Sequence, residues 1–285
     1  MISLNLNLPQ MKKLLILLFF ANAFFANAQQ KYITETDIHY YDESTNKKDP
    51  YIDSQCTLDV YYPENKKDFV TIIWFHGGGL TKGKKQIPKA LKDKGYAVIG
   101  VEYRLSPNVN APAYIEDAAA AVSWVFNTIE KYGGNKKLIF ISGHSAGAYL
   151  GTIITMDKSY LAKYSIDPME IAGLISFSGQ AITHFTIRKE QGIKSTQPTI
   201  DKYAPIFYVR ADTPPILLIT GDREMELLGR YEENAYFLRM MKLNNNKEIR
   251  LYELQGFNHS GMAEPAYPLL LNEVEVISKK ILEKK

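Results

Sequence analysis

Short apolar runs and longer amphipathic stretches alternate along the chain from residue 56 onward. The apolar runs are rich in β-branched and aromatic residues, whereas the longer stretches repeat apolar residues at helical spacing. The predicted strands are residues 57–61, 70–75, 97–102, 138–142, 171–177, 216–220 and 248–253. The predicted helices are residues 86–94, 114–132, 146–156, 230–243 and 264–283. This alternation predicts an α/β fold in which a mostly parallel central sheet carries helices on both faces.

One segment, residues 179–214, interrupts the alternation. It is rich in polar residues, contains two tyrosines and includes Pro198, Pro205 and Pro214. It is too long for a plain connection, so we predict a small lid or substrate loop there. Neither a repeat nor a linker divides the remainder, and we expect residues 29–285 to form a single domain.

The first 28 residues have the pattern of a signal peptide that is cleaved. A positive segment at residues 11–13 precedes an unbroken apolar run at 14–20, and residues 26–28 have the small-x-small pattern of a cleavage site. The apolar run is too short to span a bilayer comfortably. We therefore expect cleavage after Ala28, no stable membrane insertion afterwards, and a periplasmic or secreted mature protein.

Net charge, cysteine content and motifs bear on whether the chain binds nucleic acid or membranes, forms a disulfide or holds a metal ion. The formal net charge is +3, and the predicted signal peptide contributes Lys12 and Lys13 to it. A mature chain near neutrality predicts neither nucleic-acid nor membrane-surface binding. Cys56 is the only cysteine, which excludes an intramolecular disulfide. No H-E-x-x-H motif, paired C-x-x-C motif or carboxylate cluster predicts a metal site.

The most informative stretch is residues 138–156, where an apolar run meets Gly143-His144-Ser145-Ala146-Gly147 and then a helical pattern. A strand, the motif G-x-S-x-G and a helix in this order form the nucleophile elbow of serine hydrolases. The serine then sits in a strained turn with its Oγ exposed at the sheet edge, and small residues two positions away on either side let neighbouring chain pass closely. The alternative is a glycine-rich turn that merely contains a serine. The flanking pattern favours Ser145 as the nucleophile.

A second motif, His76-Gly77-Gly78-Gly79, follows the predicted strand at residues 70–75. Glycines allow backbone N–H groups to approach a ligand without obstruction by side chains. We predict that the amides of Gly78 and Gly79, with that of Ala146 directly after the serine, form an oxyanion hole. His76 is interpreted as a residue that orients this loop.

The base and the acid of a catalytic triad should follow the serine in the order acid, then histidine. His259, in the loop after the last predicted strand, satisfies this order. His184 precedes the candidate acids and is interpreted as a lid residue or a substrate contact. His39, His76 and His144 precede or adjoin the serine, so they fail the order.

The acid is expected just after the predicted strand at residues 216–220, since it must hold the tautomer of the histidine. Many hydrolases of this type place it three residues past a glycine such as Gly221, which selects Glu224. Asp222 is the usual residue type but lies early, and Glu226 is a weaker candidate. The sequence therefore predicts Glu224 or Asp222.

Arg104 and Asp117 are interpreted as a structural charged pair that fixes a loop, because buried pairs of this kind serve structure more often than chemistry.

Together these motifs resemble the α/β-hydrolase carboxylesterases of the hormone-sensitive-lipase type. The resemblance is carried by the motifs at residues 76–79, 103–107, 143–147 and 256–261. Residues 178–180, 183–185, 221–224 and 229–236 are still more similar to the small bacterial acetyl/feruloyl esterases of the BD-FAE group. The likeness extends over about residues 50–280. The family commonly has aspartate where Glu224 stands, so Asp222 and Glu224 both stay open.

The resemblance implies an α/β-hydrolase fold and hydrolysis of esters through an acyl-enzyme without a cofactor. We expect a secreted serine esterase for short-chain or aromatic acyl esters, either small molecules or carbohydrate-linked. The alternatives are an arylformamidase or amidase with the same residues, a peptidase of the same superfamily, and a catalytically silent binding homologue. No oligomeric state is predicted.

Overall fold

A mixed β-sheet forms the centre of residues 30–284, the part of the chain that this computed structural model describes. The predicted signal peptide, residues 1–28, lies outside the described residues. Within the described part the sheet has eight strands in the order β1-β2-β4-β3-β5-β6-β7-β8. Neighbouring strands from β4 to β8 in this order pair parallel. At one edge β2 pairs antiparallel with β4, and β1 pairs antiparallel with β2. The strands are β1 (Tyr32–His39), β2 (Thr57–Pro63), β3 (Phe69–Phe75), β4 (Ala97–Val101), β5 (Gly134–His144), β6 (Gly173–Phe177), β7 (Ile216–Gly221) and β8 (Ile249–Leu254).

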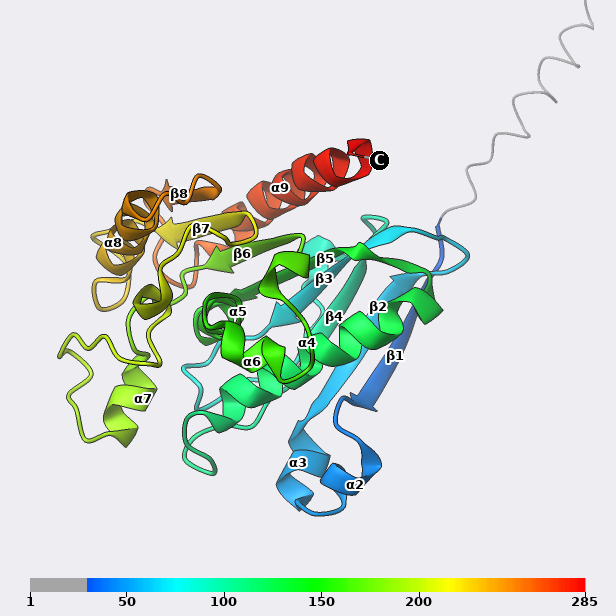
Figure 1. Cartoon of the computed structure of the whole chain (residues 1–285), viewed down its shortest axis with the longest axis horizontal. Helices are drawn as coiled ribbons and strands as arrows, with labels where there is room; N and C mark the ends of the chain where they lie inside the picture. Colours follow the sequence, from blue (N-terminus) through cyan, green and yellow to red (C-terminus); the bar gives the residue numbers. More distant parts are fainter. Residues whose placement is uncertain (1–29, 285) are drawn as a thin grey trace, which may run out of the picture. The chain divides into compact units, whose positions relative to one another are not determined.

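Helices cover both faces of this sheet (Figure 1). On one face α4 (Ala113–Tyr132) and α5 (Ala146–Met156) pack against β5, and α8 (Arg230–Leu243) packs against β7 and β8. On the other face α9 (Ala263–Glu283) packs against β5 and β6. The shorter helices are α2 (Glu43–Asn46), α3 (Pro50–Gln55), α6 (Lys158–Ala162) and α7 (Phe185–Glu190), with 3-10 turns η1 (Lys89–Leu91), η2 (Pro168–Glu170) and η3 (Pro205–Tyr208). The predicted α/β fold is confirmed.

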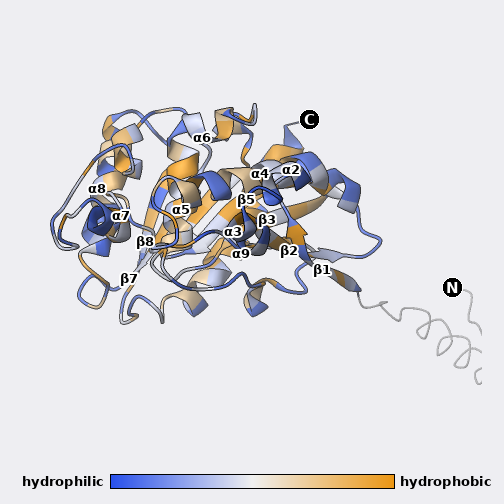
Figure 2. Cartoon of the chain, turned by 90° about the horizontal axis from the view of Figure 1, so that it is seen from below, coloured by the Kyte–Doolittle hydropathy of each residue, from blue (hydrophilic) through white to orange (hydrophobic). Residues whose placement is uncertain are grey.

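The apolar runs of the sequence become strands that are buried on both faces. In β3, Ile73 and Phe75 join the core beneath α4 and α5, while Ile72 and Trp74 join the core beneath α9. Successive side chains of a strand point to opposite faces, so a strand covered on both sides must be apolar throughout. Each large side chain buried in this way stabilises the fold by about 1.5–3 kcal/mol. Figure 2 shows the hydrophobic residues concentrated on the central strands and on α5.

One predicted element does not form, and one observed strand is not predicted by the sequence pattern. The helix predicted at residues 86–94 is wrong, because only η1 forms there; Pro88 precedes that turn, and Leu91 is its only buried residue. Proline lacks the N–H group that would continue a helix. Conversely, β1 was not predicted, since most of its side chains are exposed and it lacks an apolar face.

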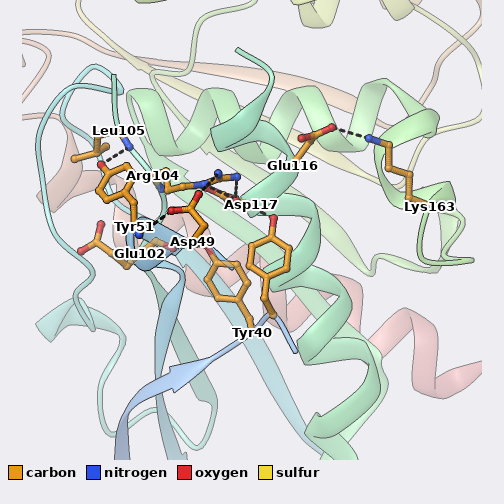
Figure 3. A network of polar contacts seen from close by, with 10 residues as sticks. Tyr40, Asp49, Tyr51, Glu102, Arg104, Leu105, Glu116, Asp117 and Lys163 are labelled. Atoms are coloured by element: carbon orange, nitrogen blue, oxygen red, sulfur yellow. Dashed lines mark hydrogen bonds and ion pairs between the residues drawn. The ribbon is translucent and has the colours of Figure 1, made fainter. Parts of the chain in front are cut away.

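The charged pair predicted at Arg104 and Asp117 is confirmed (Figure 3). Arg104 Nη2 lies 2.8 Å from Asp117 Oδ1, and Arg104 Nε lies 2.9 Å from Oδ2. Asp117 is fully buried on α4 and also accepts a hydrogen bond from the Tyr41 hydroxyl, at 2.9 Å. The pair therefore ties the segment after β4 to α4 and to the chain after β1.

Among residues 30–284, none of the helices is both long and apolar enough to cross a membrane.

Candidate active site

Ser145 occupies the turn between β5 and α5, as the G-x-S-x-G motif predicts. Its backbone has φ 56° and ψ −116°, a conformation that non-glycine residues rarely adopt, and its N–H donates to the carbonyl of Phe177 at 2.8 Å. A Cβ on Gly147 would lie 2.1 Å from the Phe75 carbonyl oxygen, and one on Gly143 would lie 2.6 Å from the same atom. Both glycines are thus required by the close passage of β3.

The imidazole of His259 reaches Ser145 from the loop between β8 and α9. His259 Nε2 lies 2.8 Å from Ser145 Oγ, and both residues are almost fully buried. His144 Nε2 donates to the His259 carbonyl oxygen at 2.9 Å. Burial, together with the neighbouring His259, lowers the pKa of His144 to about 4, so His144 is neutral at neutral pH and holds the loop through its N–H.

The carboxylate beside His259 belongs to Glu226. Its Oε2 lies 2.8 Å from His259 Nδ1, and its side chain is only 1% exposed. Burial alone would raise the pKa of Glu226, but hydrogen bonds from His259, from the Ser178 hydroxyl and from the Gly221 amide lower it to about 2. Glu226 is therefore ionised and can stabilise a positive charge on the imidazole.

Neither Glu224 nor Asp222, the two acids favoured by the sequence, contacts His259. Asp222 begins a tight turn in which its carbonyl accepts the amide of Glu226 at 2.9 Å, and this turn carries Glu226 back to the end of β7. The Asp222 carboxylate instead accepts the Gly256 amide at 2.8 Å and joins the two loops. Glu224 lies on the exposed side of the turn. Sequence spacing alone does not reveal this turn, although Glu226 was among the candidates.

The glycine loop after β3 lies next to the serine. A Cβ on Gly77 would be 3.5 Å from Ser145 Cβ, and Gly78 and Gly79 have φ values of 122° and 66°. Such positive φ values favour glycine. Ala146 is the first residue of α5, where backbone N–H groups lack intrahelical partners. This arrangement fits the oxyanion hole predicted at Gly78, Gly79 and Ala146, whose role stays a prediction.

His76 orients this loop. Its Nε2 lies 2.8 Å from Glu102 Oε1, and its Nδ1 lies 2.7 Å from the Gly77 carbonyl oxygen. The ring of Tyr103 stacks on it with centroids 4.3 Å apart, and the Tyr103 hydroxyl donates to the His76 carbonyl at 2.7 Å.

His184 lies at the start of α7 and is fully buried. Its Nδ1 accepts the Thr186 amide at 3.2 Å, and its ring contacts those of Tyr149 and Phe185. Burial and the charges of Arg230 and Arg188 hold the pKa of His184 well below its usual value. His184 thus lies buried within the predicted lid segment and packs against Tyr149 of α5, and among the described residues no hydrogen bond joins it to Ser145 or His259. A contact with substrate stays a prediction.

Ser178 is the residue at this site whose contacts sequence reasoning missed. It follows β6, and its hydroxyl lies 2.6 Å from Glu226 Oε1 and 3.0 Å from His259 Nδ1. In the sequence Ser178 stands out only as part of a short family motif, because neither its spacing nor its residue type indicates contact with the acid.

Together, Ser145, His259 and Glu226 form a continuous hydrogen-bonded chain from hydroxyl to carboxylate. Such a chain can move a proton from the serine to the imidazole while the carboxylate stabilises the imidazolium. Among the described residues no group of His, Cys, Asp and Glu side chains is arranged to hold a metal ion.

Comparison with known families identifies the family of the chain. The BD-FAE family model matches residues 58–227, which is more than half of the chain. The chain belongs to the BD-FAE family. The matched region spans β2 to β7 and the turn that carries Glu226.

Relatives of this BD-FAE family member carry names of ester hydrolases. Esterase LipC of Mycobacterium tuberculosis is 25% identical over 70% of this chain and 56% of its own length. A probable isoprenylcysteine alpha-carbonyl methylesterase of Oryza sativa subsp. japonica is 32% identical over 72% of this chain and 54% of its own. The chain therefore spans about half the length of these curated relatives.

A truncated carbohydrate esterase from gut microbiota has the same fold, with a TM-score of 0.69. At 18% identity it matches 89% of this chain and 98% of that chain.

Proposed function

We propose that this BD-FAE family member is a serine esterase. The observation that carries the proposal is the hydrogen-bonded chain from Ser145 through His259 to Glu226, beside a loop of glycine amides. The names of the relatives support the same chemistry.

In the proposed reaction Ser145 Oγ attacks the carbonyl carbon of the ester, and His259 Nε2 takes the hydroxyl proton. Amides of Gly78, Gly79 and Ala146 stabilise the negative oxygen of the tetrahedral intermediate. The bond from the acyl carbon to the alcohol oxygen breaks as His259 returns the proton to that oxygen. Water, activated by the same imidazole, then releases the acid and restores Ser145.

The substrates we propose are short-chain or aromatic acyl esters, including esters on carbohydrate. A structural neighbour described as a carbohydrate esterase supports this class. We also propose export, because residues 1–28 have the composition of a signal peptide. N-terminal sequencing of the exported protein should give Gln29 as its first residue, and a product that retains residues 1–28 would contradict cleavage.

The test of the proposed function is hydrolysis of p-nitrophenyl acetate with covalent labelling by a fluorophosphonate. Ser145→Ala should remove labelling and lower kcat by about 10⁶-fold, because the nucleophile is lost while the fold is kept. Comparison with N-formylkynurenine separates an esterase from an arylformamidase. A folded protein that neither hydrolyses esters nor accepts the label would be a binding homologue, and the proposal would fail.

A further inference from the structure

Ser178 lies outside the proposed triad but touches two of its members. It is fully buried at the end of β6, and the residue before it, Phe177, accepts the backbone N–H of Ser145. The Ser178 hydroxyl lies 2.6 Å from Glu226 Oε1 and 3.0 Å from His259 Nδ1. We infer that Ser178 is a positioning residue that aligns Glu226 and His259 for catalysis. This inference rests on the proposed esterase function.

The chemistry of the three groups fixes which atom donates to which. An ionised carboxylate only accepts hydrogen bonds, so the Ser178 hydroxyl donates to Glu226 Oε1. The Nδ1–H group of His259 donates to Glu226 Oε2 at 2.8 Å, and the Ser178 oxygen is its second acceptor. Hydroxyl, carboxylate and imidazole thus form a closed ring of contacts. The ring restricts rotation of the carboxylate and tilt of the imidazole, and hydrogen bonds to charged groups are the stronger ones.

The position of Ser178 is itself held by buried polar groups of α8. The Arg230 guanidinium donates to the Ser178 carbonyl oxygen, and Asn234 Nδ2 donates to the Gly179 carbonyl oxygen at 2.8 Å. Both Arg230 and Asn234 are at most 2% exposed. Ser178 has φ 52°, and a non-glycine residue keeps such a backbone conformation only where its surroundings enforce it. Two side chains of α8 therefore fix the turn that points the Ser178 hydroxyl at the acid.

A second buried serine on the same strand gives a matched control. Ser176 lies two residues before Ser178 on β6 and is 2% exposed. Its hydroxyl lies 3.4 Å from that of Thr152 on α5, and no hydrogen bond joins it to Glu226 or His259 in the described part of the chain. Ser176→Ala and Ser178→Ala thus remove the same group from equally buried positions, and only the second touches the acid and the base.

The experiment compares kcat and KM of Ser178→Ala, Ser178→Gly and Ser176→Ala on p-nitrophenyl acetate. We expect both Ser178 variants to lower kcat by about 10- to 100-fold with KM near wild type, because the lost hydrogen bond acts on the charge that develops in the transition state. Glycine adopts φ 52° without strain, so equal losses in the two variants assign the effect to the hydroxyl. Ser176→Ala should keep the wild-type kcat and KM.

A folded Ser178 variant with wild-type kcat would overturn the inference, and so would a change in KM alone. Thermal unfolding establishes that each variant is folded. Failure of the proposed function is distinguishable, since the unsubstituted protein would then show neither turnover nor fluorophosphonate labelling.

Discussion

Two buried imidazole–carboxylate pairs lie near the carboxyl ends of the strands, and they differ in what the second ring nitrogen faces. His76 Nε2 lies 2.8 Å from Glu102, and His259 Nδ1 lies 2.8 Å from Glu226. The remaining nitrogen of His76 faces the Gly77 carbonyl oxygen at 2.7 Å. The remaining nitrogen of His259 faces the hydroxyl of Ser145 at 2.8 Å.

A carbonyl oxygen can only accept a hydrogen bond, whereas a hydroxyl also carries a proton that a base can remove. The pair at His76 therefore holds a loop in place, and the pair at His259 is suited to proton transfer. The comparison teaches that the partner of the second nitrogen, rather than the pair itself, separates a structural histidine from a candidate base.

Among the substitutions that test this comparison, the largest expected effect comes from removing the charge of Glu226 beside His259. Glu226→Gln should lower kcat by about 10⁴-fold, because an amide no longer fixes the tautomer or stabilises the imidazolium. Glu102→Gln, the same change at the other pair, should alter kcat far less. Steady-state hydrolysis of p-nitrophenyl acetate measures both.

Glu224→Gln is the matched control for the acid, since Glu224 lies two residues from Glu226 and is exposed. It should keep wild-type turnover. A large loss in Glu224→Gln with little change in Glu226→Gln would restore the assignment that the sequence favours.

The acid shows where sequence reasoning reaches its limit at this site. Ser145 and His259 follow from motif and chain order, because a nucleophile elbow and a loop after the last strand leave few alternatives. The acid depends instead on a turn in which the Glu226 amide bonds to the Asp222 carbonyl. That turn directs Glu226 inward and Glu224 outward, and three acids within five residues give no local signal of its direction.

In the fold too, some elements can be predicted from the sequence pattern and others cannot. The central strands were predictable because burial on both faces makes them apolar throughout, as in β3. The edge strand β1 has mostly exposed side chains and therefore no such pattern. Ser178 was hidden for a related reason, since a serine that ends a strand is ordinary until another loop places a carboxylate against it.

The next effect concerns stability in acid. Glu226 has a pKa of about 2 in the folded protein, against an ordinary value of 4.5. A carboxyl group whose pKa is lower in the folded protein than in the unfolded chain stabilises the folded state at pH values above the unfolded-state pKa. This stabilisation is lost as the pH falls toward the folded-state pKa. At neutral pH the ionisation of Glu226 contributes about 3 kcal/mol to the free energy of unfolding, of which about 2 kcal/mol should be lost by about pH 3.

Urea unfolding near neutral pH and near pH 3 measures this contribution. Glu226→Gln should lose less free energy of unfolding between the two pH values than wild type, since Gln does not titrate and every other carboxyl is common to both proteins. Parallel losses in wild type and Glu226→Gln would show that the Glu226 pKa is not depressed.

The smallest effect is expected at the other pair, and it should appear in stability. The Glu102 carboxylate accepts hydrogen bonds from His76 Nε2 and, at 2.9 Å, from the Lys85 amide. Glutamine at this position keeps one acceptor oxygen but turns an N–H group toward one of the two donors. We expect Glu102→Gln to lower the free energy of unfolding by about 1–2 kcal/mol, measured by urea unfolding at neutral pH.

The substitutions Glu226→Gln and Glu102→Gln should therefore differ in their effect on kcat. At Glu226 most of the turnover should be lost, because the second nitrogen of His259 faces the Ser145 hydroxyl, the proposed nucleophile. At Glu102 turnover should survive, because the second nitrogen of His76 faces a carbonyl oxygen that takes no part in the reaction. If Glu102→Gln lowered kcat as far as Glu226→Gln while the protein stayed folded, the pair of His76 and Glu102 would contribute to catalysis as much as the pair of His259 and Glu226, either directly or through the glycine loop that it orients. The partner of the second nitrogen would then no longer distinguish the two histidines.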